Sequence, residues 1–504
     1  MRTKARQLTP YLIYGMMITI LLTWKNGIYP SLWYDEGARL LMSRVLVTYG
    51  QYATYSVSGF NPFDPSVASG PLDILSLALF ESLFGKSVSL LRLSIFPLTL
   101  IGAYLMLFGA ILLFGTRGGW MAVLTVLAAP PMLNAGYLIM GRQLLSENTS
   151  LTMVFLALSL WFHSWDKPKI FQGILAGIFL GLGLISKAQV AIWLLPALGL
   201  IWCLRTIQNR RRAIPEILFF ISCGLIMVGW FLMGRIFSTP ETLAYNQANI
   251  YETAMAQLFS GFSGKTFTRT SLFMDLTMLG ISLLTWWDLL HHKGRPRLSN
   301  SREWGRASIA TAVFICVLWH IFFDIGWPRH AYGGWILSLL LLGWWLWRLM
   351  EKMPLIQFNR YNIKPNHLYP LIVSGLIAIS LINYLPPIIR AKGPVAVEQA
   401  AGWINENIPA DAIVESTELE LAGMSNHWEF HFPPNRIILN SMNDIFYKRI
   451  QPDHDYNILE WDPDYLITGQ FSDWIGLYWH SSLFETEFIQ VAVFPPYRIF
   501  ERRR

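Results

Sequence analysis

Trp33-Tyr34-Asp35-Glu36-Gly37 places two adjacent carboxylates directly after the first apolar run of the chain, residues 11–28. An acidic pair at the end of a membrane span lies at the boundary between lipid and water, where both charges stay hydrated until a substrate covers them. The plainer alternative is a helix start, with Asp35 capping a surface helix from Glu36 onward, and spacing alone favours that alternative. The rest of the chain has to decide between them.

The composition is that of a polytopic membrane protein. Of the 504 residues, 53% are hydrophobic and only 14% are charged, and the mean hydropathy is +0.39, so most side chains cannot face water. The net charge of +7 comes from an excess of Lys and Arg. In a membrane protein this excess reads first as a signal of orientation in the membrane, so no nucleic-acid partner is implied. The three cysteines, Cys203, Cys223 and Cys316, fall in apolar runs, which argues against a disulfide framework or a cysteine metal site.

Apolar runs of about 17 to 25 residues, long enough to span a bilayer, recur along the chain. The basic residues before the first run indicate an uncleaved signal anchor with the N-terminus in the cytoplasm. The connection after each even-numbered run is rich in Lys and Arg, as cytoplasmic loops are, so the C-terminus is expected outside the inner membrane. Eleven spans are predicted, at residues 11–29, 88–114, 119–139, 146–165, 170–186, 188–204, 214–237, 271–290, 307–326, 332–350 and 369–389.

Two polar regions are predicted on the outer side. The first outer loop, residues 30–87, has helical spacing over Leu40–Val47, a turn region at Gly59–Pro65 and an amphipathic run at Leu72–Phe84, so interfacial helices are expected there. From Gly393 onward no run could span a membrane. We therefore expect a transmembrane domain over 1–392 and an extracytoplasmic α/β domain over 393–504, with a helix at 395–407 and strands at 412–416, 436–439, 465–468, 488–494 and 497–501.

Charged residues recur at the expected outer ends of the spans: Asp35, Glu36, Arg142, Glu147, Lys187 and Arg329. Taken singly, each has a structural explanation, because Arg142 and Lys187 can anchor a helix at the headgroups and Glu147 can cap its own span. Connections on the outer side should nevertheless be poor in Lys and Arg, yet each of the two shortest outer connections holds one such residue. The group therefore indicates a site.

A histidine and a carboxylate near Arg329 have a simpler interpretation. His320 and Asp324 are four residues apart, so they share a helix face and can neutralise one another. Arg329 and His330 can equally belong to a plain loop.

The order of these features resembles the GT-C superfamily of polyprenyl-phosphate-sugar-dependent glycosyltransferases, in particular the protein O-mannosyltransferase and lipid A aminoarabinose transferase type (glycosyltransferase family 39). Some relatives carry a Lys-Pro-Pro-Leu type motif at the position where this chain has Ser69-Gly70-Pro71-Leu72, which contains no lysine. The matching features are Asp35-Glu36, Ser69-Gly70-Pro71-Leu72, Leu91-Arg92-Leu93, Gly141-Arg142 to Glu147, Ser186-Lys187, Arg329 and the polar C-terminal domain.

The resemblance implies an inverting transfer of a sugar from a polyprenyl phosphate to an acceptor hydroxyl or amine on a lipid, glycan or protein. Asp35 would be the general base, and Lys187 and Arg329 would bind the donor phosphate. Glu36, Arg142 and Glu147 would orient sugar or acceptor. A divalent cation on Asp35 or Glu147 is compatible with the chemistry of carboxylates, although no closed ligand set is visible.

Two other classes of protein remain as alternatives. A secondary transporter also has about a dozen spans and buried charges, but transporters have related halves and sites near the bilayer midplane. In this chain the charges gather at one face and the halves are not alike. A non-catalytic membrane anchor for the outer domain would not need charged residues in four separate connections.

Overall fold

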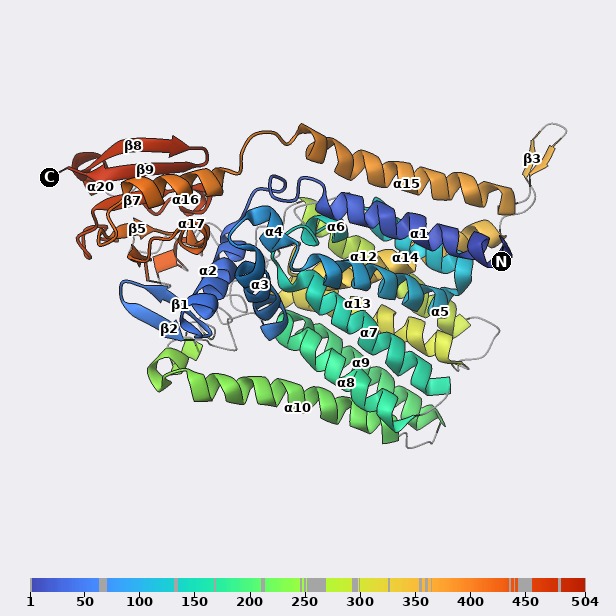
Figure 1. Ribbon diagram of the computed structural model, residues 1–504. Coiled ribbons are helices and arrows are strands. Elements are labelled where there is room, and N and C mark those ends of the chain that lie inside the picture. The colour runs from blue at the N-terminus through green and yellow to red at the C-terminus, as the bar shows by residue number, and fades with distance from the viewer. Residues whose placement is uncertain are drawn as a thin grey trace.

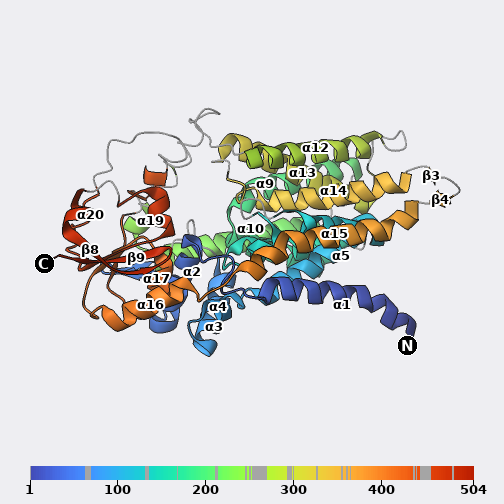
Figure 2. The ribbon, with the colours of Figure 1, turned by 90° about the horizontal axis from the view of Figure 1, so that it is seen from above.

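Long helices build most of the molecule in the computed structural model, and a small α/β domain lies at one end of them (Figure 1). The N-terminus lies at the opposite end of the bundle, and Figure 2 shows the same arrangement from above. The structure describes residues 2–503 apart from 63–69, 131–134, 167–168, 210–213, 245–246, 249–250, 252–268, 292–297, 299, 325–326, 353–355, 359–360, 364, 435–436, 439, 443–455 and 479–481.

The helices of the bundle coincide with the predicted apolar runs. They are α1 (Arg2–Thr23), α5 (Phe96–Ala128), α7 (Ser146–Asp166), α8 (Ile170–Ser186), α9 (Gln189–Asn209), α10 (Ile214–Phe237), α12 (Arg269–His291), α13 (Ser301–Phe323), α14 (Tyr332–Lys352) and α15 (Pro365–Arg390). In the described part of the chain, seven helical segments are long and apolar enough to cross a membrane, and α8 and residues 8–23 are shorter apolar helices. The polytopic helical fold is confirmed, and the number of eleven spans stays a prediction.

Helix α5 accounts for two of the predicted runs because it folds back on itself. Gly115 has φ +75°, outside the helical region, and Cβ at Gly119 would lie 2.7 Å from the Cα of Ile111 in the preceding limb. Glycine tolerates this left-handed backbone, so Gly115 turns the chain between two antiparallel limbs. The second limb ends at Ala128 rather than at residue 139 as predicted, because Pro130 follows and a residue before proline avoids the helical region.

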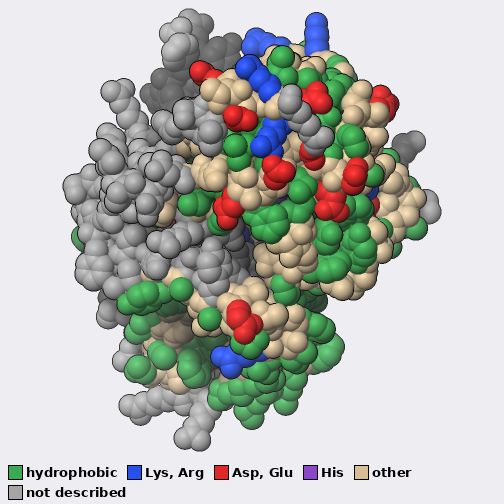
Figure 3. Space-filling model, turned by 90° about the vertical axis from the view of Figure 1, so that its left-hand side faces the viewer, with side chains coloured by type: hydrophobic (Ala, Val, Ile, Leu, Met, Phe, Trp, Pro, Cys, Tyr) green, Lys and Arg blue, Asp and Glu red, His purple; other side chains and the backbone are tan. Residues whose placement is uncertain are grey.

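Small residues let the helices of the bundle approach closely. Cβ atoms at Gly173 and Gly177 of α8 would come within 2.1 and 2.2 Å of the backbone oxygens of Pro215 and Phe219 in α10. This glycine spacing is typical of helices that pack inside membranes. The opposite face of α10 exposes large apolar side chains such as Leu225. Seen from the end of the C-terminal domain, hydrophobic side chains gather at the lower edge of the molecule, where Figure 1 places α10 (Figure 3).

Short elements lie between the bundle and the C-terminal domain. They are α2 (Tyr34–Tyr49), α3 (Pro71–Phe84), α4 (Val88–Arg92) and α6 (Tyr137–Met140), with a hairpin of β1 (Ala53–Ser56) and β2 (Gly59–Pro62). The two helices predicted in the first loop are therefore present. Residues 59–62, expected in a turn, form a strand instead, because they pair in register with 53–56; the rest of that turn region, from residue 63, lies outside the described residues. A second hairpin, β3 (Ile356–Phe358) with β4 (Tyr361–Ile363), lies at the far end of the bundle.

The C-terminal domain is built on a five-stranded sheet of order β6-β5-β7-β9-β8. β5 pairs parallel with β6 and β7, whereas β9 pairs antiparallel with β7 and β8. The elements are α16 (Ala396–Asn407), β5 (Val414–Ser416), α17 (Leu419–Met424), β6 (Phe430–His431), β7 (Tyr465–Thr468), α19 (Gln470–Ile475), α20 (Ser482–Glu487), β8 (Phe488–Phe494) and β9 (Tyr497–Arg502). The strand predicted at 436–439 is wrong, because residues 437 and 438 are helical and their amides reach back to the Pro434 carbonyl.

Helix α2 joins this domain to the bundle through two glycine contacts. A Cβ on Gly37 would lie 2.3 Å from the backbone nitrogen of Glu420, and one on Gly423 would lie 2.6 Å from Cβ of Leu40. Beside them, Tyr34 stacks on Phe471 of α19 with ring centroids 3.8 Å apart. The stretch that opens α2 therefore fixes the position of the C-terminal domain above the end of the bundle.

Candidate functional site

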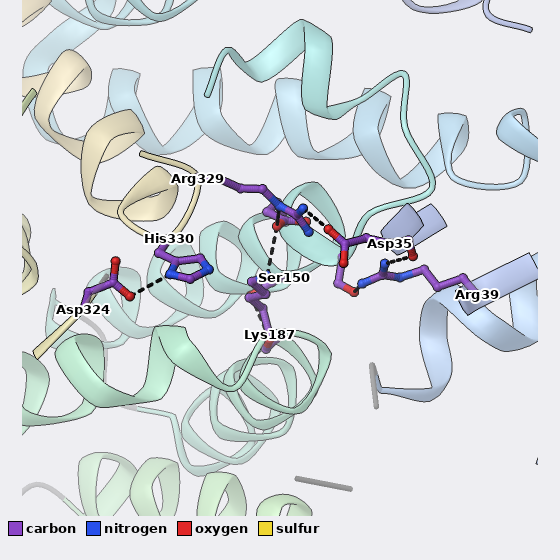
Figure 4. Close-up of polar contacts among 10 residues, drawn as sticks. Asp35, Arg39, Ser150, Lys187, Asp324, Arg329 and His330 are labelled. Carbon is purple, nitrogen blue, oxygen red and sulfur yellow. Dashed lines mark hydrogen bonds and ion pairs between the residues drawn. The ribbon is translucent and has the colours of Figure 1, made fainter. Parts of the chain in front are cut away.

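Four charged side chains from four separate connections meet at the end of the bundle next to the C-terminal domain. Asp35 lies in the first turn of α2 and Glu147 in the first turn of α7. Lys187 lies between α8 and α9, and Arg329 lies between α13 and α14. We call this group the Asp35 cluster (Figure 4). All four residues were predicted from the sequence, and the structure brings them together.

Arg329 is at the centre of the Asp35 cluster. Its Nε donates to Oε1 of Glu147 at 2.6 Å, and its Nη1 forms an ion pair with Oδ2 of Asp35. Lys187 Nζ donates to the same Glu147 oxygen at 2.9 Å. Both carboxylates lie near helix N-termini, where the helix dipole favours negative charge. The result is a network of alternating charges in which each member has a partner of opposite sign.

The members of the Asp35 cluster differ in how far solvent reaches them. The Glu147 side chain is 2% exposed and lies beneath the two cations, whereas the Asp35 side chain is 34% exposed. Lys187 and Arg329 are intermediate, at 18% and 11%. An incoming molecule can therefore reach Asp35 and the two cations, while Glu147 is placed to hold the cations in position.

The charges of the cluster change the acidity of its members. Burial alone would raise the pKa of Asp35, but the positive charge of Arg329, with smaller effects from Arg39 and Lys187, lowers it below its ordinary value. Burial would lower the pKa of Arg329, and the charges of Glu147 and Asp35 raise it instead. Burial lowers the pKa of Lys187, and Glu147 offsets only part of that effect. Asp35 is consequently ionised and Arg329 is permanently cationic.

Arg39 supports Asp35 from one turn further along α2. Its Nη1 donates to the backbone oxygen of Asp35 at 2.8 Å, and its Nη2 donates to Oγ of Ser146 at 2.9 Å. Arg39 was not predicted as a site residue, although its i to i+4 spacing from Asp35 places both on one helix face. This residue adds a third cation and ties α2 to the start of α7.

Glu36 points away from Asp35 and is not brought into the cluster. Both of its carboxylate oxygens are bound by Arg92, at 3.0 Å from Nε and 2.6 Å from Nη2, and the Leu144 amide donates to Oε2 at 2.8 Å. Both side chains of this ion pair are fully buried. The contact fastens α2 to α4 and to the turn before α7, which is a structural role.

Arg142 is also held by the protein itself. It is 1% exposed, and it donates to the carbonyls of Leu21, Trp24 at 2.8 Å and Tyr29 at 2.9 Å. These carbonyl groups lie in the last turn of α1 and in the segment after it. No backbone N–H group within the helix is available to them there. The geometry therefore does not support the expected contact of Arg142 with sugar or acceptor.

Asp73 is a further carboxylate near the cluster that the sequence analysis missed. It lies in the first turn of α3, is 3% exposed, and accepts a hydrogen bond from Thr149 Oγ1. Burial raises its pKa, and the hydrogen bond from Thr149 and the charge of Arg39 offset part of this. Glycine at position 70 allows the approach of α3, because a Cβ there would lie 2.8 Å from the Ile185 carbonyl at the end of α8.

The residues of the cluster do not fit a divalent cation. Across the described residues, no group of three or more His, Cys, Asp and Glu side chains is arranged to hold a metal ion. Asp35 and Glu147 share the guanidinium of Arg329, so a cation between them would have to displace Arg329.

Comparisons with known proteins bear on the fold. The family model of dolichyl-phosphate-mannose-protein mannosyltransferases matches residues 69–234, from the first loop into α10. One similar structure is the crystal structure of ArnT from Cupriavidus metallidurans bound to undecaprenyl phosphate, whose sequence is 15% identical to this one. The match covers 98% of this chain and 98% of that chain, with a TM-score of 0.62. The oligosaccharyltransferase of Archaeoglobus fulgidus, in complex with zinc and sulfate, is 12% identical over 91% of this chain and 67% of its own, with a TM-score of 0.58. No curated protein matches the sequence.

Proposed function

We propose that this chain, which has the fold of the GT-C superfamily of membrane glycosyltransferases, is an inverting transferase that moves a sugar from a polyprenyl-phosphate donor to an acceptor hydroxyl or amine. The observation that carries the proposal is the Asp35 cluster, in which an accessible carboxylate lies beside two cations at one end of the bundle. We place that end at the outer face of the inner membrane, because the expected basic loops lie at the other end.

The cations of the cluster suit a leaving phosphate. In the transfer, the acceptor oxygen or nitrogen bonds to the anomeric carbon while the bond from that carbon to the phosphate oxygen breaks, and the electron pair stays on the phosphate. Lys187 and Arg329 can each donate charge-assisted hydrogen bonds to that phosphate. Glu147 lies beneath both and keeps their ammonium and guanidinium groups in place before the donor arrives.

Asp35 suits the base that takes the acceptor proton. In the free protein its ion pair with Arg329 lowers its pKa and makes it a weak base. A donor phosphate that binds Arg329 adds negative charge beside Asp35 and competes for the same guanidinium, and both effects raise the basicity of Asp35. Donor binding would therefore prepare the base for its task.

The arrangement argues against a secondary transporter, for which a site near the middle of the bundle is expected. The Asp35 cluster lies instead at the first turn of α2, and α2 lies between the end of the bundle and the C-terminal domain (Figure 1). In addition, the other members of the Asp35 cluster come from α7 and from the loops before α9 and α14, not from two related halves.

The experiment that tests the function uses membranes containing the full chain and a panel of radiolabelled polyprenyl-phosphate sugars. The proposal predicts transfer of label from at least one donor to a lipid, glycan or protein product. Asp411→Asn, an exposed carboxylate of the C-terminal domain, serves as the matched control and should retain transfer. Absence of a labelled product from every donor, with correctly folded protein, would count against the proposal.

A further inference from the structure

Three tryptophans from separate elements form a row beside the Asp35–Arg329 ion pair, and each of them is half-buried. Trp33 precedes α2, Trp327 lies in the loop before α14, and Trp474 belongs to α19 of the C-terminal domain. The ring centroid of Trp474 lies 6.1 Å from that of Trp33 and 6.3 Å from that of Trp327, within the range of aromatic contacts. We call Trp33, Trp474 and Trp327 the tryptophan row. Through it the C-terminal domain reaches the candidate site.

The tryptophan row and the ion pair connect the same two stretches of the chain. Trp33 is two residues before Asp35, and Trp327 is two residues before Arg329. Because consecutive Cα atoms are about 3.8 Å apart, the Cα of each of these tryptophans lies within about 7.6 Å of the Cα of its charged neighbour. The charged side chains are joined by their ion pair, and the two tryptophans are joined by Trp474. The accessible carboxylate of Asp35 therefore has an aromatic surface beside it.

Trp327 is held in place by groups at the end of α13. Its backbone N–H donates to Oδ2 of Asp324 at 3.3 Å, and its carbonyl oxygen lies 3.1 Å from Nε2 of His320. His320 and Asp324 do share a helix face, as expected, with 3.6 Å between Nε2 and Oδ2. The Trp327 ring packs edge-on against His330, with centroids 5.6 Å apart, and Figure 4 shows His330 close to Arg329. The position of Trp327 is therefore fixed before a ligand arrives.

The other two tryptophans also have an anchored backbone. The carbonyl oxygen of Trp33 accepts from the Gly37 amide at 3.1 Å in the first turn of α2. The start of α19, which carries Trp474, is bound by the buried carboxylate of Glu418, which accepts from the Ser472 amide at 2.8 Å. Anchored backbones with partly exposed rings are typical of a binding surface that is formed in advance.

The tryptophan row is packed more loosely than the contacts that dock the C-terminal domain. Docking relies on the close approach of α2 at Gly37 and on the stack of Tyr34 on Phe471, whose ring centroids are 3.8 Å apart. Neighbouring rings of the row are 6.1 and 6.3 Å apart and remain partly accessible. Docking therefore does not account for the partly exposed indole rings.

Charged side chains border the row on the C-terminal domain. Asp473 precedes Trp474 and accepts from Nη2 of Arg498 with both carboxylate oxygens, at 2.6 and 2.7 Å. The side chains of this ion pair are 39% and 30% exposed. A lipid chain does not suit such a surface, because it would remove water from charged groups without replacing their hydrogen bonds. The aromatic row with its polar border suits a ligand that has both an apolar face and hydroxyl groups.

A sugar ring has these two properties. One face of a pyranose presents C–H groups, which the attached oxygens make slightly positive, and its hydroxyl groups project from the edge. The negative face of an indole ring attracts such C–H groups. The planes of Trp327 and Trp474 are 28° from parallel, so their faces are turned in nearly the same direction. A sugar stacked on the row can direct a hydroxyl towards Asp35.

The position of the row favours the acceptor over the donor. In the proposed transfer the donor lipid comes from the membrane and its phosphate binds Lys187 and Arg329, whereas Asp35 takes the proton of the acceptor. The row begins two residues from Asp35 and extends to Trp474 in the C-terminal domain, beyond the end of the bundle. It therefore lies where an acceptor can approach the base from the side of this domain.

We propose that the tryptophan row is a saccharide-binding subsite, which stacks a sugar residue of the acceptor beside Asp35. This inference rests on the proposed transferase function and narrows its acceptor to a glycan or the sugar headgroup of a glycolipid. The hydroxyl oxygen of the stacked sugar bonds to the anomeric carbon of the donor, and its proton passes to Asp35. The bond from that carbon to the phosphate oxygen breaks, and its electron pair leaves with the phosphate. The C-terminal domain then contributes directly to the site through Trp474.

The test begins with the labelled product that wild-type membranes form from the radiolabelled polyprenyl-phosphate sugars. We expect linkage analysis to find the label joined by a glycosidic bond to another sugar residue. Trp474→Leu is then compared with wild type and with Trp461→Leu, which replaces a 39% exposed tryptophan of the same domain outside the row. With acceptor membranes limiting, we expect transfer by Trp474→Leu to be slower by about tenfold or more. Binding of a polyprenyl monophosphate should be unchanged, and Trp474→Tyr, which keeps an aromatic face, should recover most of the transfer.

The possible results separate this inference from the function on which it rests. Label joined to an amino-acid side chain or to a lipid group other than a sugar would overturn the subsite while the transferase proposal stands. Normal transfer by Trp474→Leu, or equal losses of transfer and of monophosphate binding, would overturn it as well. If protease releases the C-terminal domain of Trp474→Leu faster than that of wild type, Trp327→Leu replaces it in the same comparison. Absence of labelled product from every donor with folded wild-type protein would overturn both proposals.

Discussion

Arg329 and Asp35, 294 residues apart in the chain, form an ion pair at the end of the bundle next to the C-terminal domain. Their contact joins the loop before α14 to the first turn of α2. Arg329 also binds Glu147, which in turn binds Lys187, so the pair links the accessible carboxylate of the site to Glu147 and Lys187.

The donor phosphate should depend on Lys187. We expect Lys187→Met to weaken binding of a polyprenyl-phosphate donor by about 1.5 to 3 kcal/mol, as for loss of a hydrogen bond to a charged group. Lys392→Met replaces an exposed lysine just after α15 and should leave binding within about 0.5 kcal/mol of wild type. Donor titrations of the purified proteins measure both. Equal affinities in the two variants would indicate that Lys187 merely reaches for lipid headgroups.

The pH dependence of transfer should report the effect of Arg329 on Asp35. Transfer needs an ionised base, so kcat/KM should fall as the pH drops through the pKa of Asp35. Arg329 lowers that pKa, so in Arg329→Gln the fall should occur at higher pH than in wild type. Arg39→Gln should move the profile in the same direction by less, because its charge has the smaller effect. Profiles of kcat/KM against pH that coincide for wild type and Arg329→Gln would contradict this coupling.

Glu36 should matter for folding. Removing one partner of its fully buried pair with Arg92 leaves an uncompensated charge, so Glu36→Ala should lower the free energy of unfolding by about 3 to 5 kcal/mol. The double variant Glu36→Leu with Arg92→Met removes both charges and should lose less than the single variant. Thermal unfolding in detergent gives the comparison. A stable Glu36→Ala protein without transfer activity would instead point to a role in chemistry.

Gly37 should hold the C-terminal domain against α2. An added Cβ would lie 2.3 Å from the backbone nitrogen of Glu420, so Gly37→Ala must push the two elements apart. We expect faster proteolytic release of a fragment near residues 391–395 and loss of transfer. Gly402→Ala is the matched control, because nothing lies within 4 Å of its added Cβ. If both variants resist protease like wild type, the close contact is not needed for docking.

Hydropathy predicted most of the bundle because a membrane span needs a long apolar run, whatever its neighbours are. The same pattern failed where other forces decide. The run Ile437-Ile438 has the β-branched composition of a strand, yet it is helical after Pro434. It packs in a cluster of buried apolar side chains that includes Leu466 and Phe471. Tertiary packing overrode the local preference there.

The candidate site could be predicted only in part. Asp35, Glu147, Lys187 and Arg329 were identifiable because charges are conspicuous at the ends of apolar runs. The sequence could not tell that Arg142 binds the carbonyls after α1, since its partners lie more than a hundred residues away. Asp73 was missed for a related reason: its place on an amphipathic helix indicates a polar face, but not that Thr149 covers that face.

The most direct test of the account is single-turnover transfer of a radiolabelled sugar from its polyprenyl phosphate by Asp35→Asn. The substitution keeps shape and hydrogen bonding but removes the base. We therefore predict transfer slower by roughly 10² to 10⁴-fold, with donor binding nearly intact, while the folded fraction of Glu36→Gln still transfers. Transfer at the wild-type rate by Asp35→Asn would contradict the central claim, and normal transfer by Asp35→Asn beside an inactive, folded Glu36→Gln would move the catalytic role to Glu36.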